Sequence, residues 1–179
     1  MLKKFVLTAF CEDRPGIVAD ISEVIYKNHC NLEDSTMANL AGEFAIILLF
    51  SPLSAGEETD LEERLSAECR RLEREKGIIA FIRPVSHPES KPKAAFHAKN
   101  LLVEGQDHAG IVYKVSRFLA DNDINIATLK SDVKFSPESG TAIYTLSLAV
   151  EIPHKVSLPT VEQKLHQIEE ELHVDITLE

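Results

Sequence analysis

The chain has 179 residues, of which 44% are hydrophobic, and a formal net charge of −10. Because phosphate contacts require clustered Lys and Arg side chains, this acidic balance argues against direct binding of nucleic acid. No apolar run approaches the ~20 residues that cross a bilayer, and the N-terminus lacks a signal-peptide pattern. We therefore expect a cytoplasmic protein that contacts neither nucleic acid nor membrane.

Hydrophobic periodicity in the first half predicts the order strand, helix, strand, strand, helix, strand. These elements are expected at residues 2–10, 13–27, 30–39, 44–50, 59–76 and 78–83. Asn28 is predicted to end the first helix in the left-handed conformation, and Gly77 to end the second. Thr59 and Glu62 have the spacing of a capping box at the start of the second helix. The continuous apolar run at 44–50 is typical of a strand inside a sheet.

The second half repeats the same order. Its elements are expected at residues 97–105, 110–120, 125–135, 141–152, 160–172 and 174–178. The fold class is therefore α+β, with two ferredoxin-like (βαββαβ) domains in tandem, each with an antiparallel sheet and both helices on one face. We expect the domains at 1–84 and 96–179, joined by a Pro- and Lys-containing linker at 85–95. The second hairpin carries four extra residues around 135–139.

A repeated loop supports this division. The segment Asp13-Arg14-Pro15-Gly16-Ile17-Val18 returns 94 positions later (107 − 13) as Asp107-His108-Ala109-Gly110-Ile111-Val112. Each copy leads from a strand into a helix, where free backbone N–H groups can hold an anion such as a carboxylate.

The repeated residues have structural and functional interpretations that the sequence leaves open. Gly16 and Gly110 suit a tight strand-to-helix turn whether or not it binds anything. The Asp at the start of each turn is by default a helix cap. Asn31 and Asn125 recur at the same offset, and we expect them near their own turns, where an amide can bind a carboxylate and an ammonium group. They could equally be held by the loop backbone.

Enzymatic and metal chemistry have little support. Cys11, Cys30 and Cys69 are odd in number and lack the C-x-x-C spacing of a zinc site, and the seven His residues lack metal-ligand spacing. An enzyme using Cys11, Asp13 and His108 is an alternative, but the acidic neighbours of Cys11 would raise its pKa. We therefore expect no catalytic residue, no metal and no cofactor.

The strand followed by Asp-Arg-Pro-Gly-Ile-Val, a helix and Asn-His-Cys-Asn-Leu resembles the ACT domain, a small-molecule-binding regulatory module, in two copies. Segments 30–35 and 42–49 are similar to the glycine cleavage system transcriptional repressor group, whose members consist of two ACT domains. In ACT domains the ligand, usually an amino acid, lies between the first turn of one domain and the second strand of its neighbour. The resemblance thus implies ligand-binding roles for Asp13, Arg14, Pro15, Gly16, Ile17 and Asn31, and for Asp107, His108, Gly110, Ile111 and Asn125.

These observations favour an amino-acid-sensing regulator that acts in trans, because the chain has no output domain. Glycine or serine is the favoured ligand, and the resemblance implies a DNA-binding regulator of glycine and one-carbon metabolism as the partner. The alternative is a separately encoded regulatory subunit of an amino-acid biosynthetic enzyme. Because sheet edges are costly to leave unpaired, we also expect a homodimer.

Overall fold

The computed structural model describes residues 3–54, 60–85, 95–135 and 140–179. Its contacts divide the chain into two compact units, Met1–Ser90 and Lys91–Glu179. Most of the expected linker, residues 86–94, lies outside the described residues, as do Thr59 of the expected capping box and residues 136–139 of the second hairpin. Within the described part, no helix is both long and apolar enough to span a bilayer.

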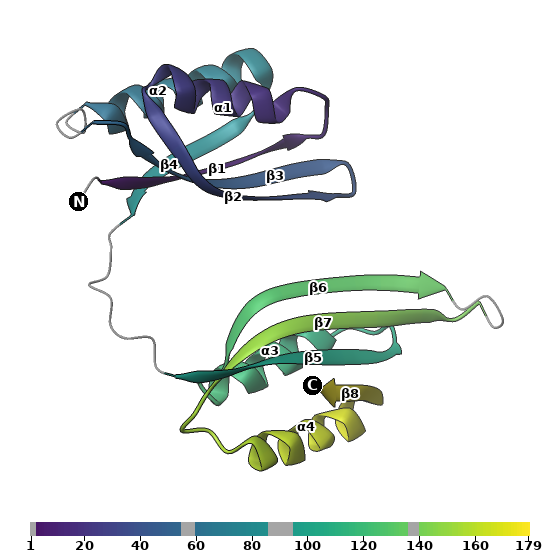
Figure 1. The fold of residues 1–179 in the computed structure, drawn as a ribbon. Coiled ribbons are helices and arrows are strands. Elements are labelled where there is room, and N and C mark those ends of the chain that lie inside the picture. The colour runs from purple at the N-terminus through teal and green to yellow at the C-terminus, as the bar shows by residue number, and fades with distance from the viewer. Residues whose placement is uncertain (1–2, 55–59, 86–94, 136–139) are drawn as a thin grey trace. The chain divides into compact units, whose positions relative to one another are not determined.

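The first unit has the predicted βαββαβ order. Its elements are β1 (Lys4–Glu12), α1 (Ile17–Lys27), β2 (Cys30–Leu40), β3 (Glu43–Pro52), α2 (Leu61–Lys76) and β4 (Ile79–Val85). The strands form one antiparallel sheet in the order β2-β3-β1-β4, and α1 and α2 cover one face of it (Figure 1). This confirms the predicted ferredoxin-like fold and places the apolar run of β3 inside the sheet.

Side chains on the helix-facing side of this sheet form the core of the first unit. Phe5 and Phe50 lie side by side on β1 and β3 with ring centroids 5.8 Å apart, and both are fully buried. The helices contribute the apolar residues that the 3.6-residue period predicted: Ile17, Ile21, Val24 and Ile25 from α1, and Leu61, Leu65, Cys69 and Leu72 from α2.

The second unit repeats this arrangement. Its elements are β5 (Phe96–Gln106), α3 (Ile111–Asp121), β6 (Asn125–Phe135), β7 (Ala142–Pro153), α4 (Leu158–Leu172) and β8 (Val174–Leu178). The sheet order is β6-β7-β5-β8, which is the order of the first sheet element for element. Leu101, Val103, Leu146 and Leu148 form the centre of its core.

The end of α1 differs from the prediction in one detail. Asn28 is the C-cap, but its φ is −93°, and the left-handed residue is His29, with φ 55°. The Asn28 side chain instead donates to the Val24 carbonyl at 2.9 Å, which keeps its own backbone near the helical region. In the second unit Asn122 and Asp123 divide these two roles in the same way. Gly77 ends α2 in the left-handed conformation, as predicted.

Candidate functional site

The repeated turn lies between β1 and α1, and again between β5 and α3. Gly16 and Gly110 are the N-cap residues of these helices, with φ of 92° and 107°. A Cβ on Gly110 would meet nothing within 4 Å, and one on Gly16 would meet only the Arg14 Nη1 at 3.8 Å. Space therefore does not require glycine here; the left-handed backbone does.

Asp13 connects this turn to the β2–β3 hairpin. Its backbone N–H donates to the Gly42 carbonyl at 2.8 Å, and its carboxylate accepts a hydrogen bond from the Asn39 amide. Neither α1 nor α3 has a side-chain cap on its first turn, so the interpretation of Asp13 and Asp107 as helix caps is wrong. The reason is that Gly16 and Gly110, not the aspartates, occupy the capping positions.

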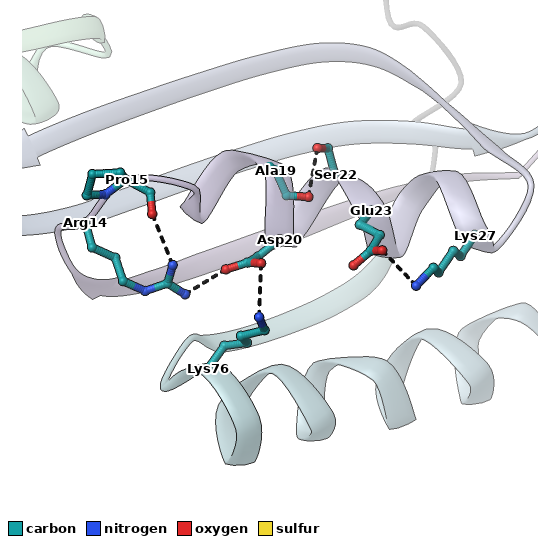
Figure 2. A network of polar contacts seen from close by, with 8 residues as sticks. All are labelled: Arg14, Pro15, Ala19, Asp20, Ser22, Glu23, Lys27 and Lys76. Carbon is teal, nitrogen blue, oxygen red and sulfur yellow. Dashed lines mark hydrogen bonds and ion pairs between the residues drawn. The ribbon is translucent and has the colours of Figure 1, made fainter.

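Arg14 lies along the outside of α1 instead of extending from the turn. Its Nη2 donates to the Asp20 carboxylate at 2.7 Å, and its Nη1 donates to the Pro15 carbonyl at 3.3 Å (Figure 2). The other Asp20 oxygen lies 3.5 Å from Lys76 Nζ, at the end of α2. The hydrogen bond from Arg14, together with the charge of Lys76, lowers the pKa of Asp20 below its usual range. Asp20 thus joins the turn, α1 and α2.

The second unit holds the equivalent loop in a different way. The Nε2 of His108 lies 2.8 Å from the Leu172 carbonyl at the end of α4, and its Nδ1 lies 3.2 Å from the Ala109 carbonyl. Since a carbonyl only accepts, a hydrogen bond to Leu172 requires the tautomer in which Nε2 donates. Lys114 takes the position of Asp20 and bonds to Glu171 of α4 at 2.6 Å. Each unit therefore has an ion pair between its two helices, but the acidic and basic residues have exchanged helices.

The two asparagines lie far from the turns of their own units. Asn31 pairs with Ser51, whereas the residue before Asp13 pairs with Glu43, at the other end of β3. These positions on β3 are eight steps apart (51 − 43), about 26 Å at the ~3.3 Å rise of a strand. The expectation that each asparagine lies near its own turn is wrong, because β2 starts where α1 ends.

The side chains of Asn31 and Asn125 also differ from each other. Asn125 Nδ2 donates to the Glu151 carboxylate at 2.9 Å across the β6–β7 pair. Within the described residues, the Asn31 side chain is exposed and has no hydrogen bond. An incoming ligand would therefore displace an existing contact at Asn125 but none at Asn31.

The remaining predicted residues shape the turns. Ile17 and Ile111 begin the two helices, and each is only 2% exposed, so they anchor the helix starts in the cores. Pro15 occupies the turn before Gly16, and its exposed carbonyl accepts the bond from Arg14.

Burial makes two of the thiols poor nucleophiles. Cys11 faces the first core, where burial raises the pKa of its thiol. Burial and neighbouring Glu68 raise the pKa of Cys69 to about 11. Such thiols are protonated at neutral pH and weakly nucleophilic. Among the described residues, no three His, Cys, Asp or Glu side chains are placed to hold a metal ion.

Sequence reasoning did not identify Asn39, Asp20 or Lys76. Their roles depend on contacts between segments distant in sequence, which periodicity does not reveal. One signal was available: at the repeat offset, Asp20 corresponds to Lys114, a reversal of charge inside an otherwise repeated segment.

Comparisons with known proteins give a family model and several similar proteins. Residues 3–79 match the model of the ACT domain. The chain is 26% identical over 168 residues to the glycine cleavage system transcriptional repressor of Escherichia coli, covering 94% of this chain and 85% of that protein. It is 30% identical over 81 residues to the UPF0237 protein MK1213 of Methanopyrus kandleri, covering 45% of this chain and 87% of that protein. The crystal structure of an unknown protein from Galdieria sulphuraria matches with 31% identity and a TM-score of 0.80, covering 100% of this chain and 98% of that one.

Proposed function

Since this chain belongs to the ACT domain family, we propose that it is an amino-acid-sensing regulatory protein that acts in trans on a partner. The observation that carries this proposal is the first turn, where a left-handed Gly16 opens α1 without any side-chain cap. The first N–H groups of an uncapped helix attract a carboxylate, and the helix dipole adds to that attraction.

The amino-acid site would combine two domains. Because about 26 Å of β3 separates the first turn from Asn31, one domain cannot place both on one small ligand. The turn of one ACT domain would hold the carboxylate, and the Asn31 amide of a neighbouring domain would accept from the ammonium group. Because the Asn31 side chain has no hydrogen bond among the described residues, it needs no rearrangement to do so.

The two units would contribute unequally. In the second unit, His108 is held by the end of α4 and Asn125 by Glu151. Ligand binding there would first have to break those contacts, so we propose that Asn31 and the Asp13–Ile17 turn form the principal site. Glycine or serine is the favoured ligand, and the similarity to the glycine cleavage system transcriptional repressor supports this choice.

The regulated partner would be a DNA-binding protein that controls genes of glycine and one-carbon metabolism. The similarity to the E. coli repressor supports this assignment. With a net charge of −10, the chain is suited to contacting such a protein and not the DNA itself. Ligand binding need change partner affinity by a coupling of only ~1–3 kcal/mol to act as a switch.

A thermal-shift panel of the twenty free amino acids tests ligand binding. Glycine or serine at ~100 times its dissociation constant should stabilise the protein by about 2.7 kcal/mol, a shift that is easily measured. Glycinamide, which lacks the carboxylate, and N-acetylglycine, which lacks the ammonium group, are matched controls that should have no effect. A flat response to every amino acid at millimolar concentration would contradict the proposal.

Affinity capture from the native cells tests the partner. Recovery of a DNA-binding protein, in an amount that changes with added glycine, would support transcriptional control. Recovery of an amino-acid biosynthetic enzyme instead would favour the role of a regulatory subunit.

A further inference from the structure

The face of the first sheet that the helices leave bare is apolar. We call this the outer face. It is formed by the side chains that point away from the helices, and residues paired across β2, β3, β1 and β4, in that order, form rows across it. Four large apolar side chains on it are well exposed: Phe10 at 40%, Ile47 at 47%, Ile79 at 38% and Phe81 at 54%. The rings of Phe10 and Phe81 lie 6.0 Å apart, so these side chains form a patch.

The second sheet provides an internal comparison. The strand registers align the four residues of the patch with Glu104, Ser147, Asp175 and Thr177. All four of these are polar and exposed. At these four positions the same fold in the same chain is polar in the second unit and apolar in the first, which indicates that the apolar patch of the first unit is covered in use.

The outer faces of two copies are complementary to each other in shape. Three rows of outward residues run across the sheet, each with one residue from β2, β3, β1 and β4. If two copies pack their outer faces together around a two-fold axis parallel to the strands, β4 of one copy lies over β2 of the other. Ile79 would then face the small Ala38, and Phe10 would face Ala45. Large side chains meet small ones, as interdigitated sheet packing requires.

The middle row contains a hollow that can accept a side chain of the other copy. A depression of about 110 Å³ lies between β2 and β3, lined by Asp34, Ser35, Thr36, Ile47 and Leu49. Phe81 belongs to the same row as Thr36 and Ile47, at the opposite edge of the sheet. The same two-fold axis therefore places Phe81 over the hollow of the other copy.

The third row carries charges of opposite sign at its two ends. Asp34 of β2 and Arg83 of β4 lie in one row with Leu49 and Val6 between them. The axis brings Asp34 of one copy over Arg83 of the other, twice per dimer. Glu12 and Glu43 lie beyond the first row and limit the apolar contact to these three rows.

The size of the face suits a small dimer interface. Four strands spaced ~4.8 Å apart and the five residues of β1 that the three rows span, at ~3.3 Å each, give a projected area of roughly 320 Å². This is less than half of the ~800 Å² per partner of a standard interface, so the face suits a small, weak interface. The outer face of the second unit is a poorer occupant, because the charged Glu104 and Asp175 would be removed from water there.

We propose that two copies of this chain associate through the outer face of the first sheet, around a two-fold axis parallel to its strands. The homodimer then has a defined interface that is distinct from the sheet edges. This axis keeps the first turn of each copy about 26 Å along the strands from Asn31 of the other copy, so the interface does not form the amino-acid site and can fail or hold independently of it.

Sedimentation equilibrium of the full chain tests the proposal. Wild type should have about twice the 19.9 kDa chain mass at micromolar concentration. The variant Ile47→Ser/Phe81→Thr, which introduces the residues of the second sheet, should weaken dimerisation by about a hundredfold or more, because hot-spot side chains dominate interfaces. Tyr26→Ser, at an 81% exposed aromatic residue on α1, is the matched control and should leave the mass unchanged.

Charge reversal tests the axis. Asp34→Arg and Arg83→Asp should each weaken the dimer, because each places like charges together, and the double reversal should restore it. Circular dichroism checks that every variant is folded. A monomeric wild type would overturn the proposal, and it would leave the second unit or a different protein as the occupant. A dimer that is indifferent to these folded variants would overturn it too, and it would place the contact at the sheet edges.

Discussion

Replacing Asn31 by alanine separates a ligand-binding role from a structural one. The Asn31 side chain has no hydrogen bond within the described residues, so its loss should change stability by no more than about 0.5 kcal/mol. If it bonds the charged end of an amino acid, the same change should cost about 1.5–3 kcal/mol of binding free energy. That corresponds to a dissociation constant raised by about 10- to 150-fold.

Asn125→Ala is the matched variant, and it should show the reverse pattern. Its amide bonds to Glu151 at 2.9 Å, so removal should lower stability by about 0.5–1.5 kcal/mol while glycine affinity stays unchanged. Isothermal titration calorimetry with glycine gives the affinities, and urea unfolding gives the stabilities. Equal glycine affinity in wild type and a folded Asn31→Ala protein would refute our assignment of Asn31 to the site.

Three further predictions follow from the turns and the charge. Gly16→Ala and Gly110→Ala should each lower the free energy of unfolding by about 1 kcal/mol or more, because alanine is strained at these positive φ values. Urea unfolding measures this change, and unchanged stability would contradict the left-handed turn. Asp20→Asn should cost up to about 1 kcal/mol at neutral pH, since it removes the bonds to Arg14 and Lys76. Because the folded pKa of Asp20 is lowered, this contribution is fully present above its unfolded pKa and is lost as the pH falls through the folded one. In acid titrations of stability, variant and wild type should therefore converge only as the pH falls below about 3.9. Finally, the purified chain should give no gel shift with duplex DNA at physiological salt, because its net charge is −10; a shift at nanomolar protein would argue for direct DNA binding.

The core and the order of elements were predictable because they depend on local periodicity. Apolar residues three and four apart identified the buried face of α1, and the continuous run of β3 identified an interior strand. The start of α1 was predicted four residues early, at Asp13. Pro15 disfavours helical backbone at Arg14, and Gly16 takes a left-handed φ, so the helix begins only at Ile17.

The contacts that organise the turns were not predictable in the same way. The bond between Asp13 and Asn39 joins residues 26 positions apart, and the pair of Asp20 with Lys76 joins two helices. Each depends on how the elements pack, which no local pattern records. The position of Asn31 was mispredicted for a similar reason: compactness suggested proximity to the turn, but strand register sets it at the opposite end of β3.

The reversed ion pairs show why the two turns differ. Asp20–Lys76 and Lys114–Glu171 connect the same two helices in their units, so either sign serves helix packing equally well. The sign does matter to the turn. An aspartate at this position holds Arg14 along α1, whereas a lysine would repel an arginine there, and the second unit carries His108 instead, bonded to the end of α4. The residue type in the turn is therefore coupled to the charges of the helix ion pair. In the first unit this coupling places a cation beside the uncapped start of α1, where a ligand carboxylate would bind in the proposed site.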